Sequence, residues 1–284
     1  MISKPEWLHI RHSNSQDREA VEELLKNLNL NTVCREANCP NAYECFTRKT
    51  ATFMILGTNC TRICPFCNVS NGEPLQIDLN EPRNIAEAVK TLGLKYVVVT
   101  SVTRDDLPDG GAEHFAKVIL EIKKTTKDVA VEVLIPDFMG DNDSLKTVVR
   151  AFPNVISHNV ETVKSLYPEV RPQASYERTL KVLRNIREFG EGKIHSKSGV
   201  MLGMGETEAE LYMLFDDLLE NGCEFLTIGQ YLAPSKRHFP VHDYIEPEKF
   251  EKYGEIARQK GFAFVSSAPL VRSSYHADEA LKTE

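Results

Sequence analysis

The sequence predicts an α/β fold, a partial (β/α)6 barrel, and three observations lead to it. Short strand-like runs alternate with amphipathic helical stretches along most of the 284 residues. The connections between them are a few residues long, which indicates parallel strands with right-handed crossovers. Polar side chains follow the ends of several successive strands, as at the active-site face of a β/α barrel. The first two observations leave a doubly wound sheet open, and the third favours the barrel.

Six strand–helix units make up the pattern. The predicted strands cover residues 52–57, 96–101, 129–135, 155–160, 198–202 and 225–230. The predicted helices cover residues 17–28, upstream of the units, and then 85–92, 112–124, 144–151, 176–188, 208–220 and 247–260. Six units instead of eight would leave the barrel open on one side. We therefore expect an N-terminal extension (1–50) and a C-terminal extension (263–284) to cover that side of a core formed by residues 51–262.

The composition excludes several classes of protein. The chain is 42% hydrophobic with a formal net charge of -7, and it has no Lys/Arg-rich run for holding nucleic acid. No stretch approaches the roughly 18 uncharged apolar residues of a membrane span, and residues 1–30 contain no apolar signal core. We therefore expect a cytoplasmic protein that binds neither nucleic acid nor membrane.

Cysteine is the informative residue type, because six of the seven cysteines fall between Cys34 and Cys67. Nothing marks secretion, so disulfides are disfavoured and a zinc site or an iron–sulfur cluster remains. The seventh, Cys223, follows a predicted helix and is interpreted as a small buried hydrophobe.

The second half of this stretch has the spacing CxxxCxxC, formed by Cys60, Cys64 and Cys67, with Phe66 directly before the last cysteine. Three thiolates can hold three irons of a four-iron cluster and leave the fourth iron open, whereas zinc usually takes four closed ligands. This loop resembles the signature of the radical S-adenosylmethionine (SAM) enzymes. Their fold is a partial or full β/α barrel with the triplet after the first strand, which agrees with the periodicity.

The first half has the spacing CxxxxCxxxxxC, formed by Cys34, Cys39 and Cys45. A single zinc held by four of the six cysteines is the alternative interpretation. An even split into two tight triplets suits two separate sites better.

Three further segments extend the resemblance to the lipoyl synthase family: VTRDDLPDGGA (102–112), HNVETV (158–163) and RSSYHA (272–277). The resemblance implies two 4Fe-4S clusters and SAM, which together insert sulfur at C6 and C8 of an octanoyl group carried on a lysine. In the family the second cluster donates the sulfur and a serine ligates its fourth iron. By the motif, Ser274 matches that serine, and Ser273 is the alternative.

The segment Gly203–Glu206 follows the fifth predicted strand. Gly203 and Gly205 would let the backbone approach a bound nucleoside, with Glu206 beside it, as in a pattern of the radical SAM enzymes. A plain glycine turn before a helix capped by Thr207 is the alternative.

Three other polar residues follow strands and are candidates for the methionine part of SAM. Asn159 and Arg171 suit its amino and carboxylate groups, with loop-backbone hydrogen bonding as the alternative role, and Ser101 lies at the end of the second predicted strand. Tyr231 and Leu232 would flank the adenine or belong to the core.

The resemblance also implies partners. These are octanoylated lipoyl carrier domains (2-oxoacid dehydrogenase E2 or glycine cleavage H protein), an electron donor such as ferredoxin or flavodoxin, and a cluster-repair protein. The basic run Lys236, Arg237 and His238 is a candidate docking site for an acidic carrier, with a solvated loop as the alternative. The competing functions are a biotin-type sulfur inserter, an electron-transfer protein and a zinc scaffold.

Overall fold

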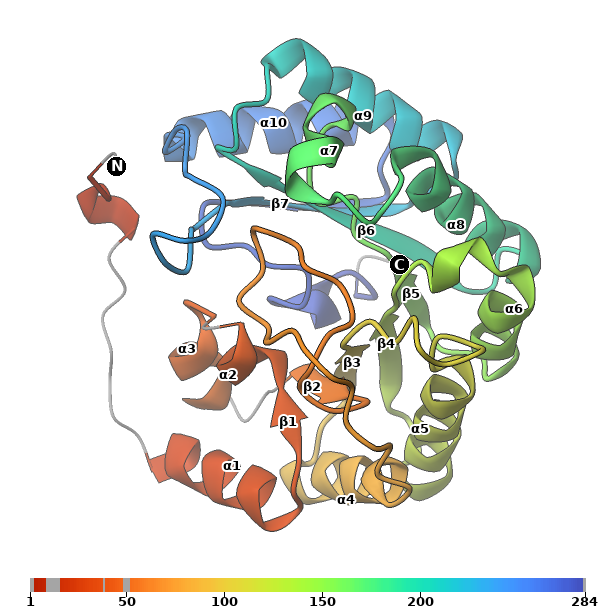
Figure 1. The fold of residues 1–284 in the computed structure, drawn as a ribbon. Coiled ribbons are helices and arrows are strands. Elements are labelled where there is room, and N and C mark those ends of the chain that lie inside the picture. Colours follow the sequence, from red (N-terminus) through yellow and green to blue (C-terminus); the bar gives the residue numbers. More distant parts are fainter. Residues whose placement is uncertain (1–2, 9–15, 38, 48–51, 283–284) are drawn as a thin grey trace. The chain divides into compact units, whose positions relative to one another are not determined.

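The computed structural model describes residues 3–8, 16–37, 39–47 and 52–282 (Figure 1). The chain divides into two compact units. Unit 1 comprises residues 1–10, 63–67 and 157–284, and unit 2 comprises residues 11–62 and 68–156. The predicted division into two extensions and a core follows the pattern of strand–helix units, not compactness, and it stays a prediction.

Unit 2 contains the first half of the strand–helix alternation. Strand β1 (Asn31–Thr32) pairs antiparallel with β2 (Thr52–Ile55), and β2, β3 (Tyr96–Ser101) and β4 (Ala130–Leu134) pair in parallel. Its helices are α1 (Gln16–Asn27), α2 (Val33–Glu36), α3 (Ala42–Thr47), α4 (Glu81–Leu92), α5 (Ala112–Thr125) and α6 (Asn142–Arg150). A short 3-10 turn, η2 (Phe138–Gly140), lies between β4 and α6.

Helix α5 shows why these segments are helical. It buries Phe115, Val118, Ile119 and Ile122, whose spacing places them on one face. The other face carries charged side chains, with Leu120 as an exposed exception, as expected of a helix that covers a sheet.

Unit 1 contains the second half. Strands β6 (His195–Leu202), β7 (Phe225–Gln230) and β8 (Phe264–Ser267) pair in parallel. Its helices are α7 (Tyr167–Val170), α8 (Tyr176–Phe189), α9 (Glu208–Glu220) and α10 (Pro247–Lys260), with 3-10 turns η1 (Glu6–Leu8), η3 (Lys164–Leu166) and η4 (Ala277–Glu279). The predicted cap of α9 is confirmed, since Thr207 and Glu210 form a reciprocal capping box there.

The fold class is confirmed. The strands β1 to β8 follow one another in chain order, with β5 (Val155–Ser157) after β4, and the pairings found among the described residues do not close the sheet. Strands β2 to β7 and their helices are the six predicted units. None of the described helices has the length and apolarity to cross a membrane.

Two details of the prediction are wrong. Strand β1 was not predicted because two residues are too few for a periodic signal, and β8 was not predicted because its sequence, FVSS, holds only two apolar residues. Strand β5 ends at Ser157 instead of residue 160, since the chain bends there: Thr162 N donates to the Val160 carbonyl and Glu161 has a positive φ of 67°.

Candidate functional site

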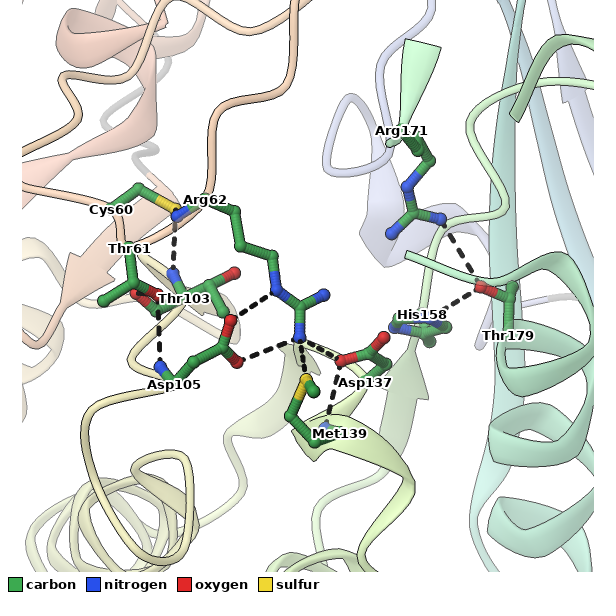
Figure 2. Close-up of polar contacts among 10 residues, drawn as sticks. All are labelled: Cys60, Thr61, Arg62, Thr103, Asp105, Asp137, Met139, His158, Arg171 and Thr179. Atoms are coloured by element: carbon green, nitrogen blue, oxygen red, sulfur yellow. Dashed lines mark hydrogen bonds and ion pairs between the residues drawn. The ribbon is translucent and has the colours of Figure 1, made fainter. Parts of the chain in front are cut away.

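Cys60 follows β2 at the start of the CxxxCxxC loop, in unit 2. Its backbone N donates to the Ser70 carbonyl at 2.8 Å. Its sulfur accepts from two backbone N–H groups, that of Thr103 at 3.4 Å and that of Arg62 at 3.5 Å (Figure 2). Cys60 therefore lies after the first parallel strand, where the sequence predicts it, with a sulfur that already receives hydrogen bonds.

Arg62 lies on the same loop and its buried guanidinium binds two carboxylates (Figure 2). Nε and Nη2 donate to the two oxygens of Asp105 at 2.7 and 2.9 Å, and Nη2 also donates to Asp137 Oδ1 at 2.7 Å. Burial alone would lower the pKa of Arg62, but the bonds to Asp105 and Asp137 raise it instead. The sequence prediction missed this network.

Cys64 and Cys67 belong to unit 1. A turn joins them, in which Cys67 N donates to the Cys64 carbonyl at 3.0 Å. Phe66 packs against a core cluster that contains Val170, Met204 and Tyr231. The aromatic residue before the last cysteine is therefore an anchor for the loop. Tyr231 lies in the core, which was one of its two predicted roles.

Asn159 and Arg171 lie close together in unit 1. Arg171 Nη1 donates to the Asn159 carbonyl at 2.9 Å and to Tyr167 Oη at 3.0 Å, so Arg171 does satisfy loop backbone. Asn159 Nδ2 donates to Ser273 Oγ at 2.7 Å, while Asn159 Oδ1 is buried without a hydrogen-bond partner.

Arg171 Nη1 also donates to Thr179 Oγ1 at 3.4 Å (Figure 2), and acidic groups lie around the guanidinium. Burial alone would lower its pKa, but neighbouring acidic groups raise it, and these are Tyr167, Glu161 and Cys64. The positive charge of Arg171 therefore interacts electrostatically with Cys64, one of the cysteines of the loop. Glu161 was not predicted as a site residue. It is half-buried, and desolvation raises the pKa of its carboxyl although Arg171 opposes that shift.

The Gly203–Glu206 segment is a tight turn. Both carboxylate oxygens of Glu206 accept backbone N–H groups, from Gly203 at 2.6 Å and from Met204 at 2.9 Å. A Cβ at position 203 would lie 2.3 Å from the Asp243 carbonyl oxygen and 2.3 Å from Gln230 Nε2. The chain itself therefore requires glycine at 203, and nucleoside binding by Gly203, Gly205 and Glu206 stays a prediction.

The upstream triplet lies in unit 2, directly after β1. Cys34 is buried in α2, and Cys39 N donates to its carbonyl at 3.0 Å. Burial raises the pKa of the Cys34 thiol to about 11, and the charge of Cys39 adds to the shift. Cys45 lies in α3. Asn68 Nδ2 donates to the Glu36 carbonyl at 2.9 Å, so the segment that follows the CxxxCxxC loop contacts the backbone between Cys34 and Cys39.

The two serines of the C-terminal motif differ in their contacts. They are the central residues of a turn closed by a bond from Tyr275 N to the Arg272 carbonyl at 2.9 Å. Ser273 accepts the bond from Asn159. Within the part of the chain that the structure describes, no hydrogen bond involves the Ser274 hydroxyl, so its oxygen is available to a ligand.

The remaining candidates lie as follows. Ser101 ends β3, and its Oγ is buried without a partner. Lys236 and Arg237 are exposed after β7. Cys223 is 2% exposed and its Sγ donates to the Phe225 carbonyl, so its interpretation as a buried hydrophobe is confirmed.

No cysteine is in a disulfide. Among the described residues, no three Cys, His, Asp or Glu side chains are arranged to hold a metal ion. The donor sets, three thiols on each of two short segments, nevertheless have the chemistry that iron–sulfur clusters require. The buried, unpartnered Asn159 Oδ1 and Ser101 Oγ likewise suit a polar ligand such as SAM.

Comparison with known proteins defines the class. The family model of the Radical SAM superfamily matches residues 54–218, more than half of the chain. The FeFe-hydrogenase maturase HydG from Carboxydothermus hydrogenoformans has a similar fold, with a TM-score of 0.60 at 14% identity, covering 94% of this chain and 70% of that one. Streptococcus suis SuiB bound to S-adenosylmethionine gives a TM-score of 0.59 at 12% identity, covering 80% of this chain and 54% of that one. The fold and the family model are those of a radical SAM enzyme.

The curated relatives define the family within that class. The lipoyl synthase of Alkaliphilus metalliredigens (strain QYMF) is 57% identical over 279 residues, covering 98% of this chain and 96% of that one. The lipoyl synthase of Caldicellulosiruptor saccharolyticus is 58% identical over 279 residues, covering 98% of each. The chain belongs to the lipoyl synthase family. Its members are radical SAM sulfurtransferases, and the superfamily implies a 4Fe-4S cluster and SAM.

Proposed function

We propose that this chain inserts two sulfur atoms, at C6 and C8, into an octanoyl group amide-linked to a lysine of a lipoyl carrier domain. When bound, SAM and the first cluster supply a carbon radical that removes hydrogen from an unactivated C–H bond, and the second cluster supplies sulfur. The protein's own residues hold these groups, orient the substrate and exclude water.

One observation supports a second cluster on the upstream triplet. The bond from Asn68 to the Glu36 carbonyl joins the segment after the CxxxCxxC loop to the segment of the upstream triplet. A chain with a single cluster would not need a second cysteine triplet there. We assign the first cluster to Cys60, Cys64 and Cys67, and the second to Cys34, Cys39 and Cys45 with Ser274.

The experiment that tests this assignment separates the two triplets. Cys64→Ala should abolish formation of 5′-deoxyadenosine from SAM. Cys39→Ala should keep that reaction and lose lipoyl formation. Anaerobically isolated wild-type protein should contain about eight irons per chain, the sum of two four-iron clusters, and each variant about four. If either variant loses both reactions and all its iron, the two triplets do not form independent sites.

Ser274 is the serine we assign to the second cluster, because Ser273 already accepts a bond from Asn159. Alkoxide is a less natural ligand for iron than thiolate, so a serine-bound iron should leave readily when sulfur is transferred. Ser274→Cys should therefore keep a full cluster and SAM cleavage but slow the second sulfur insertion, whereas Ser273→Ala should have a milder effect. Labelled sulfide built into the clusters should appear in the product, with at most one lipoyl group per chain when no repair protein is present. Many turnovers with unlabelled sulfur would refute the donor role.

SAM binding is assigned to residues of each unit. In unit 1, Asn159 Oδ1 offers an unpartnered acceptor for the methionine ammonium, and Arg171 offers positive charge for its carboxylate. In unit 2, Ser101 Oγ offers a further unpartnered hydroxyl. Gly203, Gly205 and Glu206 are assigned to the nucleoside end.

The partners we propose follow from the chemistry. The substrate is the octanoylated carrier domain of a 2-oxoacid dehydrogenase E2 or of the glycine cleavage H protein. A ferredoxin or flavodoxin supplies electrons, and a repair protein rebuilds the consumed cluster. The exposed Lys236 and Arg237 are the surface we assign to the carrier.

A further inference from the structure

The backbone N–H of Thr103 points at the sulfur of Cys60, 43 residues earlier in the chain, at 3.4 Å. Arg62 N is the second donor to that sulfur, at 3.5 Å, and it belongs to the same loop (Figure 2). Hydrogen bonds to the sulfurs of an iron–sulfur cluster are among the factors that set its reduction potential. The groups that hold Thr103 in place therefore influence how easily a cluster on Cys60 is reduced.

Thr61 is the first of these groups. Its N donates to the Thr103 carbonyl at 3.1 Å and its Oγ1 donates to the same oxygen at 3.0 Å. The hydroxyl oxygen also accepts from Asp105 N at 3.1 Å. Two segments, 60–62 and 103–105, are thus joined by hydrogen bonds on both sides of the Thr103 peptide.

Arg62 is the second group. Its planar fork matches both oxygens of Asp105, at 2.7 and 2.9 Å, and its third contact is to Asp137 Oδ1 at 2.7 Å. Asp105 follows β3 and Asp137 follows β4, so one side chain ties the cysteine loop to the ends of two strands. The side chain of Arg62 is 5% exposed and that of Asp137 is 1% exposed, so the bond between these two side chains is poorly screened by water.

Asp137 in turn fixes an unusual turn. Its Oδ1 also accepts from Met139 N at 3.1 Å. Phe138 and Met139 both have positive φ, 44° and 52°, a conformation that non-glycine residues rarely adopt. The Arg62–Asp137 bond therefore ends on a turn held in one conformation, which makes it a rigid attachment point.

We propose that Arg62, together with Thr61 and Asp105, is a positioning residue that keeps the Thr103 N–H on the Cys60 sulfur and thereby sets the reduction potential of the SAM-cleaving cluster. This role rests on the proposed assignment of Cys60 as a ligand of that cluster. It also gives Thr103 and Asp105, two residues of the VTRDDLPDGGA segment, a specific role.

The test uses a matched pair of variants at Thr61. Thr61→Val keeps the shape of the side chain and its lack of charge but removes the hydroxyl that bonds Thr103 and Asp105. Thr61→Ser keeps the hydroxyl and is the control. Midpoint potentials are measured on the holoenzyme by redox titration followed by electron paramagnetic resonance, using the signal that changes when SAM is added.

Thr61→Val should shift the midpoint to more negative potential, because a lost N–H···S bond no longer stabilises the charge of the reduced cluster. At the wild-type midpoint, the ratio of reduced to oxidised cluster should fall at least threefold, and a tenfold fall corresponds to 59 mV for one electron. Thr61→Ser should stay within twofold of wild type. Arg62→Lys, which keeps the charge but loses the fork, should shift the midpoint in the same direction as Thr61→Val.

Two outcomes separate failure of this inference from failure of the cluster assignment. If Cys60→Ala loses the SAM-responsive signal while Thr61→Val leaves the midpoint unchanged, the positioning role is wrong and the assignment stands. If Cys60→Ala keeps that signal, the cluster assignment itself fails. Because Thr61→Val removes no charge and leaves no cavity, we expect this variant to fold. The positioning role can therefore be tested even if Arg62→Lys does not fold.

Discussion

Replacing Gly203 with alanine should destabilise the protein strongly, because the added methyl group would collide with neighbouring atoms of the chain. The added Cβ would lie 2.3 Å from Asp243 O and 2.3 Å from Gln230 Nε2. Gln230 cannot move aside cheaply, since its amide N donates to three backbone carbonyls and its oxygen accepts from Ile245 N at 2.9 Å. Overpacking costs about 1–3 kcal/mol, the positive φ of 94° about 1–2 kcal/mol, and an unsatisfied amide about 1–3 kcal/mol. We expect the free energy of unfolding to fall by about 3 kcal/mol or more.

Gly261→Ala is the matched control. Gly261 also has a positive φ, 120°, but a Cβ there would meet nothing within 4 Å. It should therefore lose only the conformational part, about 1–2 kcal/mol. The measurement is urea unfolding followed by circular dichroism on both variants, with SAM affinity measured beside it. Equal unfolding midpoints would refute the crowding argument. If Gly203→Ala kept wild-type stability and bound SAM at least tenfold more weakly, the nucleoside would be the reason for glycine at this position.

Three further predictions concern individual side chains or pairs of them. Ser101→Ala should weaken SAM binding but leave the free energy of unfolding within about 0.5 kcal/mol of wild type, because the buried Oγ makes no bond that would be lost. Unchanged SAM affinity in an equilibrium binding assay would remove Ser101 from the site. The double variant Lys236→Glu, Arg237→Glu should slow modification of the carrier domain at low salt, with the difference shrinking as salt is added, and equal initial rates would exclude docking there. Because desolvation raises the pKa of Glu161 in the folded protein, the protonated carboxyl contributes stability below pH 4.5, and this contribution is lost as the pH rises through the native pKa. Over that range the free energy of unfolding of wild type should therefore fall relative to that of Glu161→Gln. Parallel plots of the two free energies against pH would contradict the prediction.

The positions of the six parallel strands and their helices could be predicted, because apolar periodicity is a local property of the sequence. The loop that carries Cys60 could also be placed, since it follows the first of these strands. The contacts of Arg62 could not be predicted, because its partners Asp105 and Asp137 lie 43 and 75 residues away in the chain. Only the parallel register of the strands brings such residues to the same edge of a sheet.

The choice between the two serines shows a different limit. Ser273 and Ser274 are adjacent, and the motif alone favours Ser274 only by position. The structure adds a physical difference, because Asn159 Nδ2 donates a hydrogen bond to Ser273. Gly199 leaves room for the Ser273 hydroxyl, since a Cβ at position 199 would lie 2.9 Å from Ser273 Oγ. Which hydroxyl is already bonded depends on a residue 114 positions away, and no local pattern carries that information.

The bend after β5 concentrates features that cost stability. Glu161 adopts a positive φ of 67° and has a carboxyl whose pKa is raised by desolvation, and Asn159, only 9% exposed, leaves Oδ1 unpartnered. Backbone bonds hold the bend in place, from Glu161 N to the Gly199 carbonyl at 2.9 Å and from Met201 N to the Glu161 carbonyl at 2.8 Å. Strained backbone conformations cluster at active sites, ligand clamps and switch regions. At Gly203, by contrast, packing of the chain itself accounts for the glycine, so the bend at Asn159 is the stronger candidate for contact with SAM.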